Sequence, residues 1–217
     1  MVSGVKLSKS TDGVVSRYIN RKISIRITLA IAKYNIPLTP NMVSFISFIL
    51  GLMASLLYFI YQPIIAGIMV QVSSIIDGVD GELARIKRME SRFGGFLDAI
   101  LDRIVDIAII LGLTSYSLYT CNLPPLMVSI VGMLALSGCL MVSYVHARGE
   151  ASLKIHPALI GKVSGIASRD VRLFLIFIGS IINYPFETLL IIAILSYIYV
   201  VLKIIEVSLH YREDRKR

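Results

Sequence analysis

Charged residues are scarce in this chain. Of its 217 residues, 17% are charged and 56% are hydrophobic, and the mean hydropathy is +0.77. A soluble domain carries about 25% charged residues, so the composition excludes an ordinary soluble domain. Apolar runs of about 17 to 25 residues indicate membrane spans, and several are present. The sequence therefore predicts an all-α membrane protein that crosses the bilayer several times.

Cysteine is scarce as well, and the chain shows no secretory leader. Cys121 and Cys139 are too few for a disulfide framework or a zinc site. The first residues, MVSGVKLSKSTDG, lack the apolar core of a signal peptide. The net charge is +8, but the basic residues lie between apolar segments, where they orient a membrane protein. We therefore expect no nucleic-acid partner.

Six apolar segments predict six transmembrane helices, at residues 41–60, 63–82, 94–118, 124–147, 170–183 and 187–208. The fifth has few apolar residues, and we expect it to recruit part of the preceding loop. Residues 12–34 mix basic and apolar residues at helical spacing, which is typical of an amphipathic helix lying at the cytosolic interface. Thr39-Pro40 then begins the first span. We expect a juxtamembrane helix within residues 1–40 and a six-helix domain at 41–217.

Basic residues occupy only alternate loops. The loops near residues 61–62, 119–123 and 184–186 contain neither Lys nor Arg. Because positive charge gathers on the cytosolic side of a membrane protein, this asymmetry places both termini and the basic loops in the cytosol.

Four aspartates interrupt the apolar pattern of the second and third spans. At about 1.5 Å per residue across a core about 30 Å thick, Asp77 lies within about 9 Å of the cytosolic face, and Asp80 lies closer still. Asp98 and Asp102 lie about 6 and 12 Å inside the third span. The two aspartates of each span share one helix face. The four carboxylates are thus predicted to converge near the cytosolic side.

Such buried carboxylates need a positive partner, since each Asp at mid-membrane costs roughly 2.5–3.5 kcal/mol. With no His or Cys nearby, oxygen ligands indicate Mg²⁺, Mn²⁺ or Ca²⁺. One alternative is acids solvated at the interface or neutralised by Arg85, Arg88 and Arg103. Another is a divalent-cation transporter, whose acids would lie near the midplane and be accessible from both sides. The grouping on one side favours a metal site in a cavity open to the cytosol.

The spacing D-x2-D-G-x2-A-R-x8-G-x3-D-x3-D resembles, without a gap, the signature of the CDP-alcohol phosphotransferases. Its specified positions are Asp77, Asp80, Gly81, Ala84, Arg85, Gly94, Asp98 and Asp102. The six-span architecture of that family agrees with the predicted helices. The resemblance implies an enzyme that transfers a phosphoalcohol from a CDP-alcohol to an acceptor alcohol and releases CMP.

The resemblance also implies roles for these residues. Two divalent ions, Mg²⁺ or Mn²⁺, would be held by the four aspartates, with Asp102 as a ligand or as the general base. Gly81, Ala84 and Gly94 would let the nucleotide lie close to the backbone, and Arg85 would hold phosphate. Two metals suit an in-line displacement because they stabilise both the attacking and the leaving oxygen. We further expect a homodimer in the cell membrane, with its active site on the cytosolic side.

A second basic cluster points to the acceptor. Arg148, Arg169 and Arg172 lie at the cytosolic ends of the fourth and fifth spans, where family members that use phosphorylated acceptors have comparable arginines. An arginine binds phosphate through two parallel hydrogen bonds. We therefore expect these three residues to bind the phosphate of a phosphorylated polyol.

Two short segments, KSTDGVVSRYINRKIS and ASRDVRLF, look like the membrane domain of enzymes that combine inositol-phosphate cytidylyltransferase and di-inositol-phosphate phosphate synthase. This likeness implies CDP-inositol and inositol phosphate as substrates. The alternative is phospholipid synthesis from CDP-diacylglycerol and inositol phosphate or glycerol phosphate. No cytidylyltransferase domain precedes residue 1, so we expect that activity from a separate chain or from a domain outside this sequence.

Overall fold

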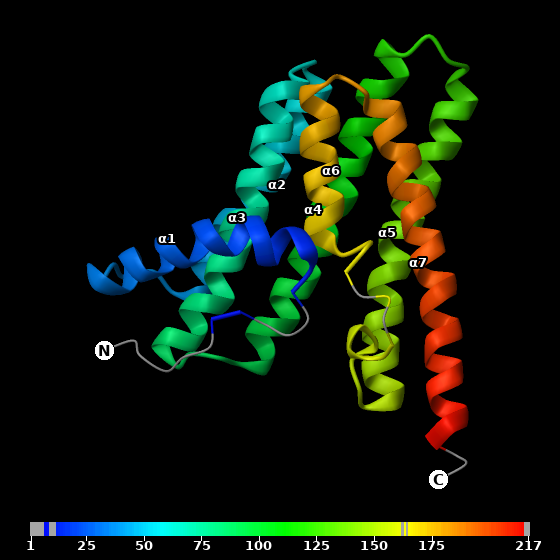
Figure 1. Ribbon diagram of the computed structural model, residues 1–217. Coiled ribbons are helices and arrows are strands. Elements are labelled where there is room, and N and C mark those ends of the chain that lie inside the picture. Colours follow the sequence, from blue (N-terminus) through cyan, green and yellow to red (C-terminus); the bar gives the residue numbers. More distant parts are fainter. Residues whose placement is uncertain (1–6, 9–11, 162, 164, 215–217) are drawn as a thin grey trace.

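The structure is a computed structural model that describes residues 7–8, 12–161, 163 and 165–214 (Figure 1). Every regular element in these residues is a helix, which confirms the all-α prediction. In chain order the elements are η1 (Ser16–Asn20), α1 (Arg21–Lys33), α2 (Pro40–Phe59), α3 (Pro63–Lys87), α4 (Arg92–Thr120), α5 (Pro125–Leu153), the short turn η2 (Pro157–Leu159), α6 (Arg169–Ile181) and α7 (Pro185–Asp214).

Proline and hydroxyl side chains begin most of the long helices. Helices α2, α3, α5 and α7 each start at a proline, whose missing N–H group is not needed in the first turn. Thr39 caps α2, because its hydroxyl accepts a hydrogen bond from the Met42 N–H at 3.3 Å. Ser91 caps α4 by accepting from the Gly94 N–H at 3.0 Å. The predicted start of the first span at Thr39-Pro40 is therefore confirmed.

Helices α2 to α7 start within two residues of the six predicted segments and end within six residues of them, with α3, α5 and α7 longer than predicted. Four of them, α2, α3, α5 and α7, are long and apolar enough to cross a membrane. Helix α4 is long but carries five charged residues between Arg92 and Asp106, and α6 has 13 residues, or about 20 Å at 1.5 Å per residue. The protein is a multi-pass membrane protein, and the number of six spans stays a prediction.

The expected extension of the fifth span into the preceding loop is wrong. Helix α6 begins at Arg169, one residue before the predicted boundary, with Ser168 as its N-terminal cap residue. The loop before it contains Gly165 at a positive φ of 77°, a backbone conformation that a helix does not use. The shortness of α6 is therefore a property of the fold.

The long helices pack in two connected groups. Helix α2 packs against α3 and α4, α3 against α6, and α5 against α7 and α4. Their buried core includes Tyr58, Ile109, Leu113 and Leu189. The connections between α3 and α4 and between α5 and α6 lie at one end of the bundle, the lower end in Figure 1. The candidate site lies near this end.

The η1–α1 unit, residues 16–33, runs across the bundle rather than along it and packs on α3 (Figure 1). Four of its polar side chains face the protein, since Asn20, Arg21, Ser24 and Thr28 are buried. Several of its apolar side chains face outward: Tyr18, Ile23 and Leu29 are exposed. An exposed apolar face is what an interfacial helix places against lipid. The interfacial position itself stays a prediction.

Candidate active site

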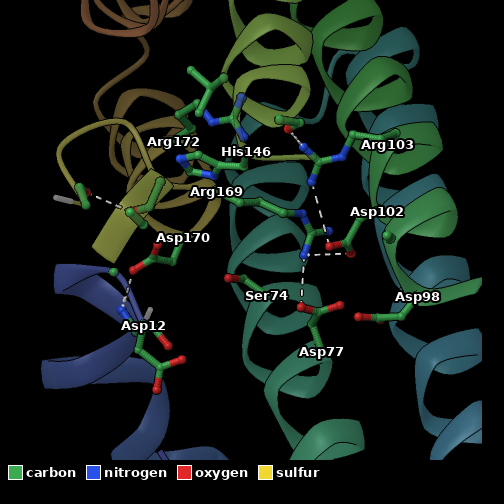
Figure 2. Close-up of a pocket in the computed structure, with 18 of the residues that line it drawn as sticks. Asp12, Ser74, Asp77, Asp98, Asp102, Arg103, His146, Arg169, Asp170 and Arg172 are labelled. Carbon is green, nitrogen blue, oxygen red and sulfur yellow. Dashed lines mark hydrogen bonds and ion pairs between the residues drawn. The ribbon is translucent and has the colours of Figure 1, made fainter. Parts of the chain in front are cut away.

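A cavity of about 750 Å³ lies among the η1–α1 unit, α3, α4, α5 and α6. Figure 2 shows its lining, with Asp77 and Asp98 on one side and Arg169, Arg172 and His146 further along the wall. The cavity therefore joins the two groups of residues that the sequence singled out, the aspartates and the arginines of the fifth span.

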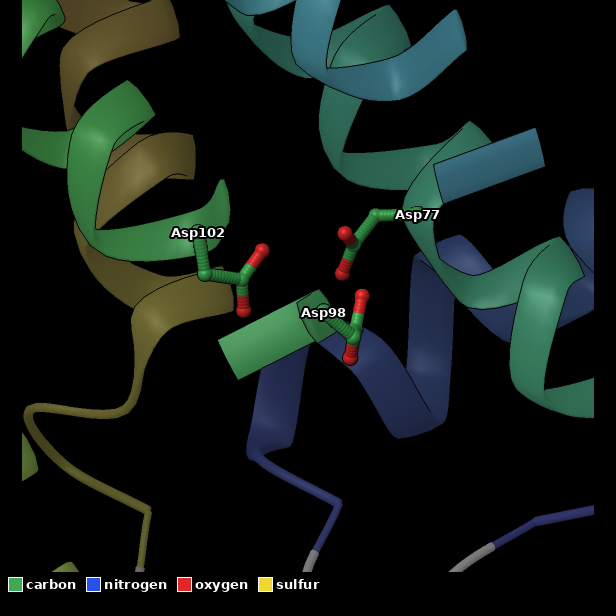
Figure 3. Close-up of side chains that lie close together, drawn as sticks. All are labelled: Asp77, Asp98 and Asp102. Carbon is green, nitrogen blue, oxygen red and sulfur yellow. The ribbon is translucent and has the colours of Figure 1, made fainter. Parts of the chain in front are cut away.

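Three of the four predicted metal ligands meet at one end of this cavity. Asp77 comes from α3, and Asp98 and Asp102 come from successive turns of α4 (Figure 3). One carboxylate oxygen of each lies within 4.8 Å of the others. Oxygens that share an ion at about 2.0–2.6 Å are at most about 5 Å apart, so this geometry fits one shared divalent cation. Carboxylate oxygens are also the ligands that Mg²⁺ and Mn²⁺ prefer.

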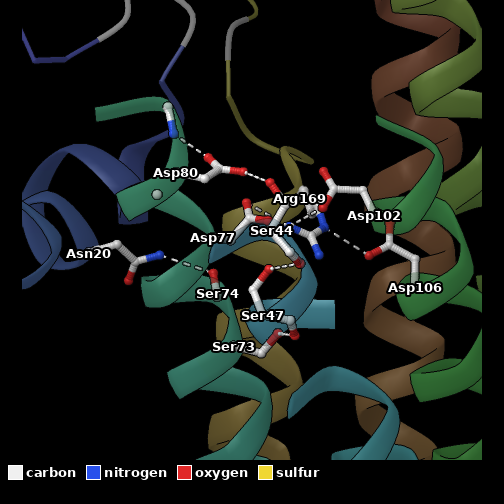
Figure 4. Close-up of polar contacts among 12 residues, drawn as sticks. Asn20, Ser44, Ser47, Ser73, Ser74, Asp77, Asp80, Asp102, Asp106 and Arg169 are labelled. Carbon is white, nitrogen blue, oxygen red and sulfur yellow. Dashed lines mark hydrogen bonds and ion pairs between the residues drawn. The ribbon is translucent and has the colours of Figure 1, made fainter. Parts of the chain in front are cut away.

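Asp80 lies beside this group and is held by other contacts. It is buried, and its carboxylate accepts hydrogen bonds from the Ser44 hydroxyl of α2 and from the Gly81 N–H (Figure 4). Its side chain also neighbours that of Asp98. Asp80 is thus oriented by α2, at the edge of the cluster that Asp77, Asp98 and Asp102 form.

Arg169 supplies the positive charge nearest to these acids. Its Nη1 lies 3.0 Å from Asp77 Oδ2 and 2.9 Å from Asp102 Oδ1. Its Nε donates to Asp106 Oδ1 at 3.1 Å. The first residue of α6 therefore spans carboxylates of both α3 and α4, and the point between Asp77 and Asp102 is one where a cation is stabilised.

Arg172 lies one turn further along α6 and has unused hydrogen-bond donors. The side chain is 3% exposed, and its Nη2 lies 3.6 Å from Asp106 Oδ2. Its Nε and Nη1 are buried and have no hydrogen-bond partner among the described residues. Because buried donors are normally paired, two unpaired guanidinium N–H groups on a cavity wall indicate a place for an anionic ligand.

The remaining predicted residues lie outside the described lining of the cavity. These residues are Gly81, Ala84, Arg85, Gly94 and Arg148. Arg85 donates to the Leu7 carbonyl at 2.5 Å, and its Nε is buried without a partner among the described residues. Arg148 is exposed at the end of α5. Gly81 lies beside the aspartates through its hydrogen bond to Asp80, and the roles of all five residues stay predictions.

Several cavity residues were not predicted. Asn20, Arg21 and Ser24 of the η1–α1 unit line the wall, as do Arg103 and His146. The basic and polar residues of segment 12–34 predict an interfacial helix, and their spacing does not indicate that some of them face the cavity. Arg103 is one of the arginines that the alternative interpretation of the sequence expects to neutralise the aspartates. It lies 3.7 Å from Asp102 and 3.3 Å from Asp106.

The chain matches the CDP-alcohol phosphatidyltransferase family over residues 37–210. It belongs to that family, whose members are phosphotransferases that act on CDP-alcohols and depend on a divalent metal. This assignment decides between the two classes weighed from the sequence, in favour of the enzyme over the cation transporter.

Two curated relatives illustrate the range of the family. A "Bifunctional IPC transferase and DIPP synthase" of Thermococcus kodakarensis is 41% identical over 169 residues, which cover 76% of this chain and 36% of the relative. The chain thus spans about a third of that protein's length. An "Archaetidylinositol phosphate synthase" of Pyrococcus horikoshii is 35% identical over 169 residues, covering 78% of this chain and 83% of the relative.

Solved structures share the fold. Phosphatidylinositol phosphate synthase of Mycobacterium tuberculosis with CDP-DAG bound matches with a TM-score of 0.71 at 23% identity, covering 86% of this chain and 94% of that one. The same protein in complex with manganese and citrate matches with a TM-score of 0.70 at 24% identity, covering 85% and 88%. The likeness confirms the helical membrane fold.

Proposed function

We propose that this enzyme joins CDP-inositol to inositol phosphate, giving di-inositol-phosphate phosphate and CMP. The observation that carries the proposal is the placement of Arg169 and Arg172 in the same cavity as Asp77, Asp98 and Asp102. A phosphotransferase with a neutral acceptor has no need of buried arginines opposite its carboxylates. The relative from Thermococcus kodakarensis supports this substrate pair by its name.

On the donor side, the four signature aspartates would hold two divalent ions, Mg²⁺ or Mn²⁺. When bound, such ions stabilise charge on the attacking and leaving oxygens of an in-line displacement. Gly81, Ala84 and Gly94 would let the nucleotide lie against the backbones of α3 and α4. The buried Nε of Arg85, which lacks a described partner, would donate to a donor phosphate.

In the transfer step, an acceptor hydroxyl attacks the phosphorus distal to cytidine. A new P–O bond to the acceptor forms as the P–O bond to CMP breaks, and CMP leaves with the bonding electrons. Asp102 would take the hydroxyl proton. Its position supports that role, because it is the member of the cluster on α4 that lies against Arg169 on the cavity wall, where the acceptor must approach the donor.

The acceptor phosphate would lie against α6. Arg172 offers two unpaired N–H groups, and Arg169 offers a guanidinium that its carboxylate partners already hold at the cavity wall. Arg148, exposed at the end of α5, would attract the incoming anion. A bidentate contact from arginine selects phosphate over a neutral headgroup.

The second candidate is lipid synthesis from CDP-diacylglycerol, with inositol phosphate or glycerol phosphate as the acceptor. The archaetidylinositol phosphate synthase of Pyrococcus horikoshii favours it, because this chain covers 83% of that relative's length. Both candidates can use the same acceptor pocket and differ in the donor. For the first, a cytidylyltransferase, in a separate chain or another domain, must supply CDP-inositol.

We also propose that both termini and the cavity face the cytosol and that the enzyme is a homodimer. The basic loops all lie at the end of the bundle that carries the cavity, which supports the orientation. Exposed apolar side chains along the long helices suit lipid or a second copy of the chain. Chemical cross-linking in native membranes, read as the mass of the linked species, tests the dimer.

The deciding experiment is a donor comparison. Purified protein is given labelled inositol phosphate, Mg²⁺ and either CDP-inositol or CDP-diacylglycerol, and CMP release is measured with the partition of the label between water and organic solvent. We expect CMP release with CDP-inositol and a water-soluble product. An organic-soluble product from CDP-diacylglycerol alone establishes the lipid enzyme. Equal use of unphosphorylated inositol contradicts the phosphate pocket in both cases.

A further inference from the structure

A buried carboxylate outside the cluster ties the η1–α1 unit to α3. Glu82 is 0% exposed. It accepts hydrogen bonds from Arg21 Nη1 at 2.7 Å, Ser24 Oγ at 2.6 Å and Thr28 Oγ1 at 2.7 Å. All three donors come from α1. An ion this deeply buried is tolerated only when such bonds satisfy it, so Glu82 fixes the position of α1 on α3.

The contact continues along α3 toward the aspartates. Arg21 Nη1 also donates to the Gly78 carbonyl at 3.1 Å, one residue from Asp77. A Cβ added at Gly78 would lie 3.3 Å from Arg21 Nη1, so the glycine permits this approach. Burial opposes the charge of Arg21, but hydrogen bonds to Asp12 and Glu82 raise the pKa of the guanidinium above its ordinary value. Arg21 therefore stays a cation in this contact.

The other end of the same unit is tied to α6. The Ser16 N–H donates to Asp170 Oδ2 at 2.5 Å. Gly13 packs so closely on Asp170 that an added Cβ would lie 2.1 Å from Asp170 Oδ1. Asp170 follows Arg169 in the first turn of α6. The segment from Gly13 to Thr28 thus bridges α3, which carries Asp77 and Asp80, and α6, which carries Arg169 and Arg172.

Helices α3 and α6 pack directly on each other at the end away from the cavity, where Gly67 lies against Ser180. We propose that residues 13–28 form a clasp that positions the other ends of α3 and α6, which carry the site, and that Glu82 and Asp170 are the positioning residues at its two ends. The proposal rests on the proposed function, in which the donor is held on α3 and α4 and the phosphorylated acceptor on α6. The clasp closes over this gap, since Gly13, Ser16, Asn20, Arg21 and Ser24 line the same cavity.

The clasp has a distinct kinetic consequence. Each substrate keeps its own binding groups when the clasp is broken, so neither substrate should bind much more weakly. The transition state, however, spans both helices, and a misplacement of about 1 Å can cost about a hundredfold in rate. Breaking the clasp should therefore lower kcat and leave both KM values nearly unchanged.

The test uses Glu82→Gln, Asp170→Ala and the double variant. We expect each single variant to lower kcat about tenfold or more, with each KM changed less than about threefold. The double variant should fall no further than the worse single variant, because the clasp fails when either end is released. The matched control is Tyr58→Phe, which removes a buried hydrogen bond to Ser180 at 2.5 Å between α2 and α6. It should lower Tm without changing kcat.

A distance measurement separates the clasp from the chemistry. Spin labels at the exposed positions Met89, just after the end of α3, and Ile178 on α6, in a Cys121→Ser background, report the separation of α3 and α6. We expect a narrow distance distribution in the otherwise unaltered chain and a broad one in Glu82→Gln. If Glu82→Gln does not fold, Thr28→Val removes one of the three bonds to Glu82 and should give a smaller change in the same direction.

The outcomes are distinguishable. The clasp is overturned if Glu82→Gln or Thr28→Val lowers Tm but leaves kcat unchanged, which is the behaviour expected of the Tyr58→Phe control. An unchanged distance distribution overturns it as well. If the unaltered chain releases no CMP with any phosphorylated polyol, the proposed function fails. The distance measurement then still decides whether Glu82 and Asp170 hold α1 between α3 and α6.

Discussion

Replacing Arg172 with alanine should weaken acceptor binding and spare donor binding. Arg172 is buried on the cavity wall, with two N–H groups that no described residue uses. A hydrogen bond to a charged group contributes about 1.5–3 kcal/mol. Loss of the contact should therefore raise the acceptor KM by about 10- to 150-fold.

The substitution of Arg172 should leave the fold intact. Asp106, the anionic neighbour of Arg172, keeps Arg103 at 3.3 Å and Arg169 at 3.1 Å. No buried carboxylate is left without a cation, so the variant should fold. Lysine at position 172 should restore activity only in part, because it keeps the charge but loses the planar fork. Alanine at the exposed Arg148 should have a smaller effect, since water screens its charge.

The assay is CMP release at saturating Mg²⁺, with donor and acceptor varied in turn. The reasoning fails if the donor KM of Arg172→Ala rises as much as the acceptor KM, because the residue would then serve folding or both substrates alike. It also fails if Arg172→Lys is as active as the unaltered enzyme, because a point charge would then be sufficient and the unpaired N–H groups would be irrelevant.

Two further predictions follow from the cluster and from the charge asymmetry. Asp98→Asn should lower turnover by about a hundredfold or more, as loss of a metal ligand does. A chelator should abolish activity, and full activity in excess chelator would contradict a metal mechanism. A cysteine at exposed Glu90 should react with an impermeant thiol reagent only from the cytosolic side, and Cys121 only from the other. Labelling of both cysteines from one side would contradict the topology.

The helices and the aspartate cluster were accessible from the sequence because both depend on local spacing. Prolines and apolar runs mark the starts of the helices, which agree to within two residues, but α3, α5 and α7 continue five or six residues past the apolar runs that predicted them. Asp98 and Asp102 lie one turn apart on α4, and helix geometry alone places them on one face. Their meeting with Asp77 depends on more than local spacing, because α3 and α4 each pack on α2, and the sequence does not indicate that arrangement.

Contacts between distant segments were not accessible in the same way. Glu82 lies inside the signature itself, yet its partner Arg21 is 61 residues away, and no periodicity links the two. Arg169 at the start of α6 pairs with Asp77 of α3, and the two residues are 92 positions apart in the sequence. The difference between the buried Arg172 and the exposed Arg148 depends on packing, which a count of basic residues does not describe.

The ion pairs of Arg169 have a consequence for how the protein folds before a metal is bound. Asp77 and Asp102 carry a counter-charge that is part of the chain, so a newly made polypeptide can be inserted and folded without waiting for a metal supply. A divalent cation held by Asp77 and Asp102 would share these carboxylates with Arg169 or displace it, so the fold itself does not depend on the metal to neutralise them.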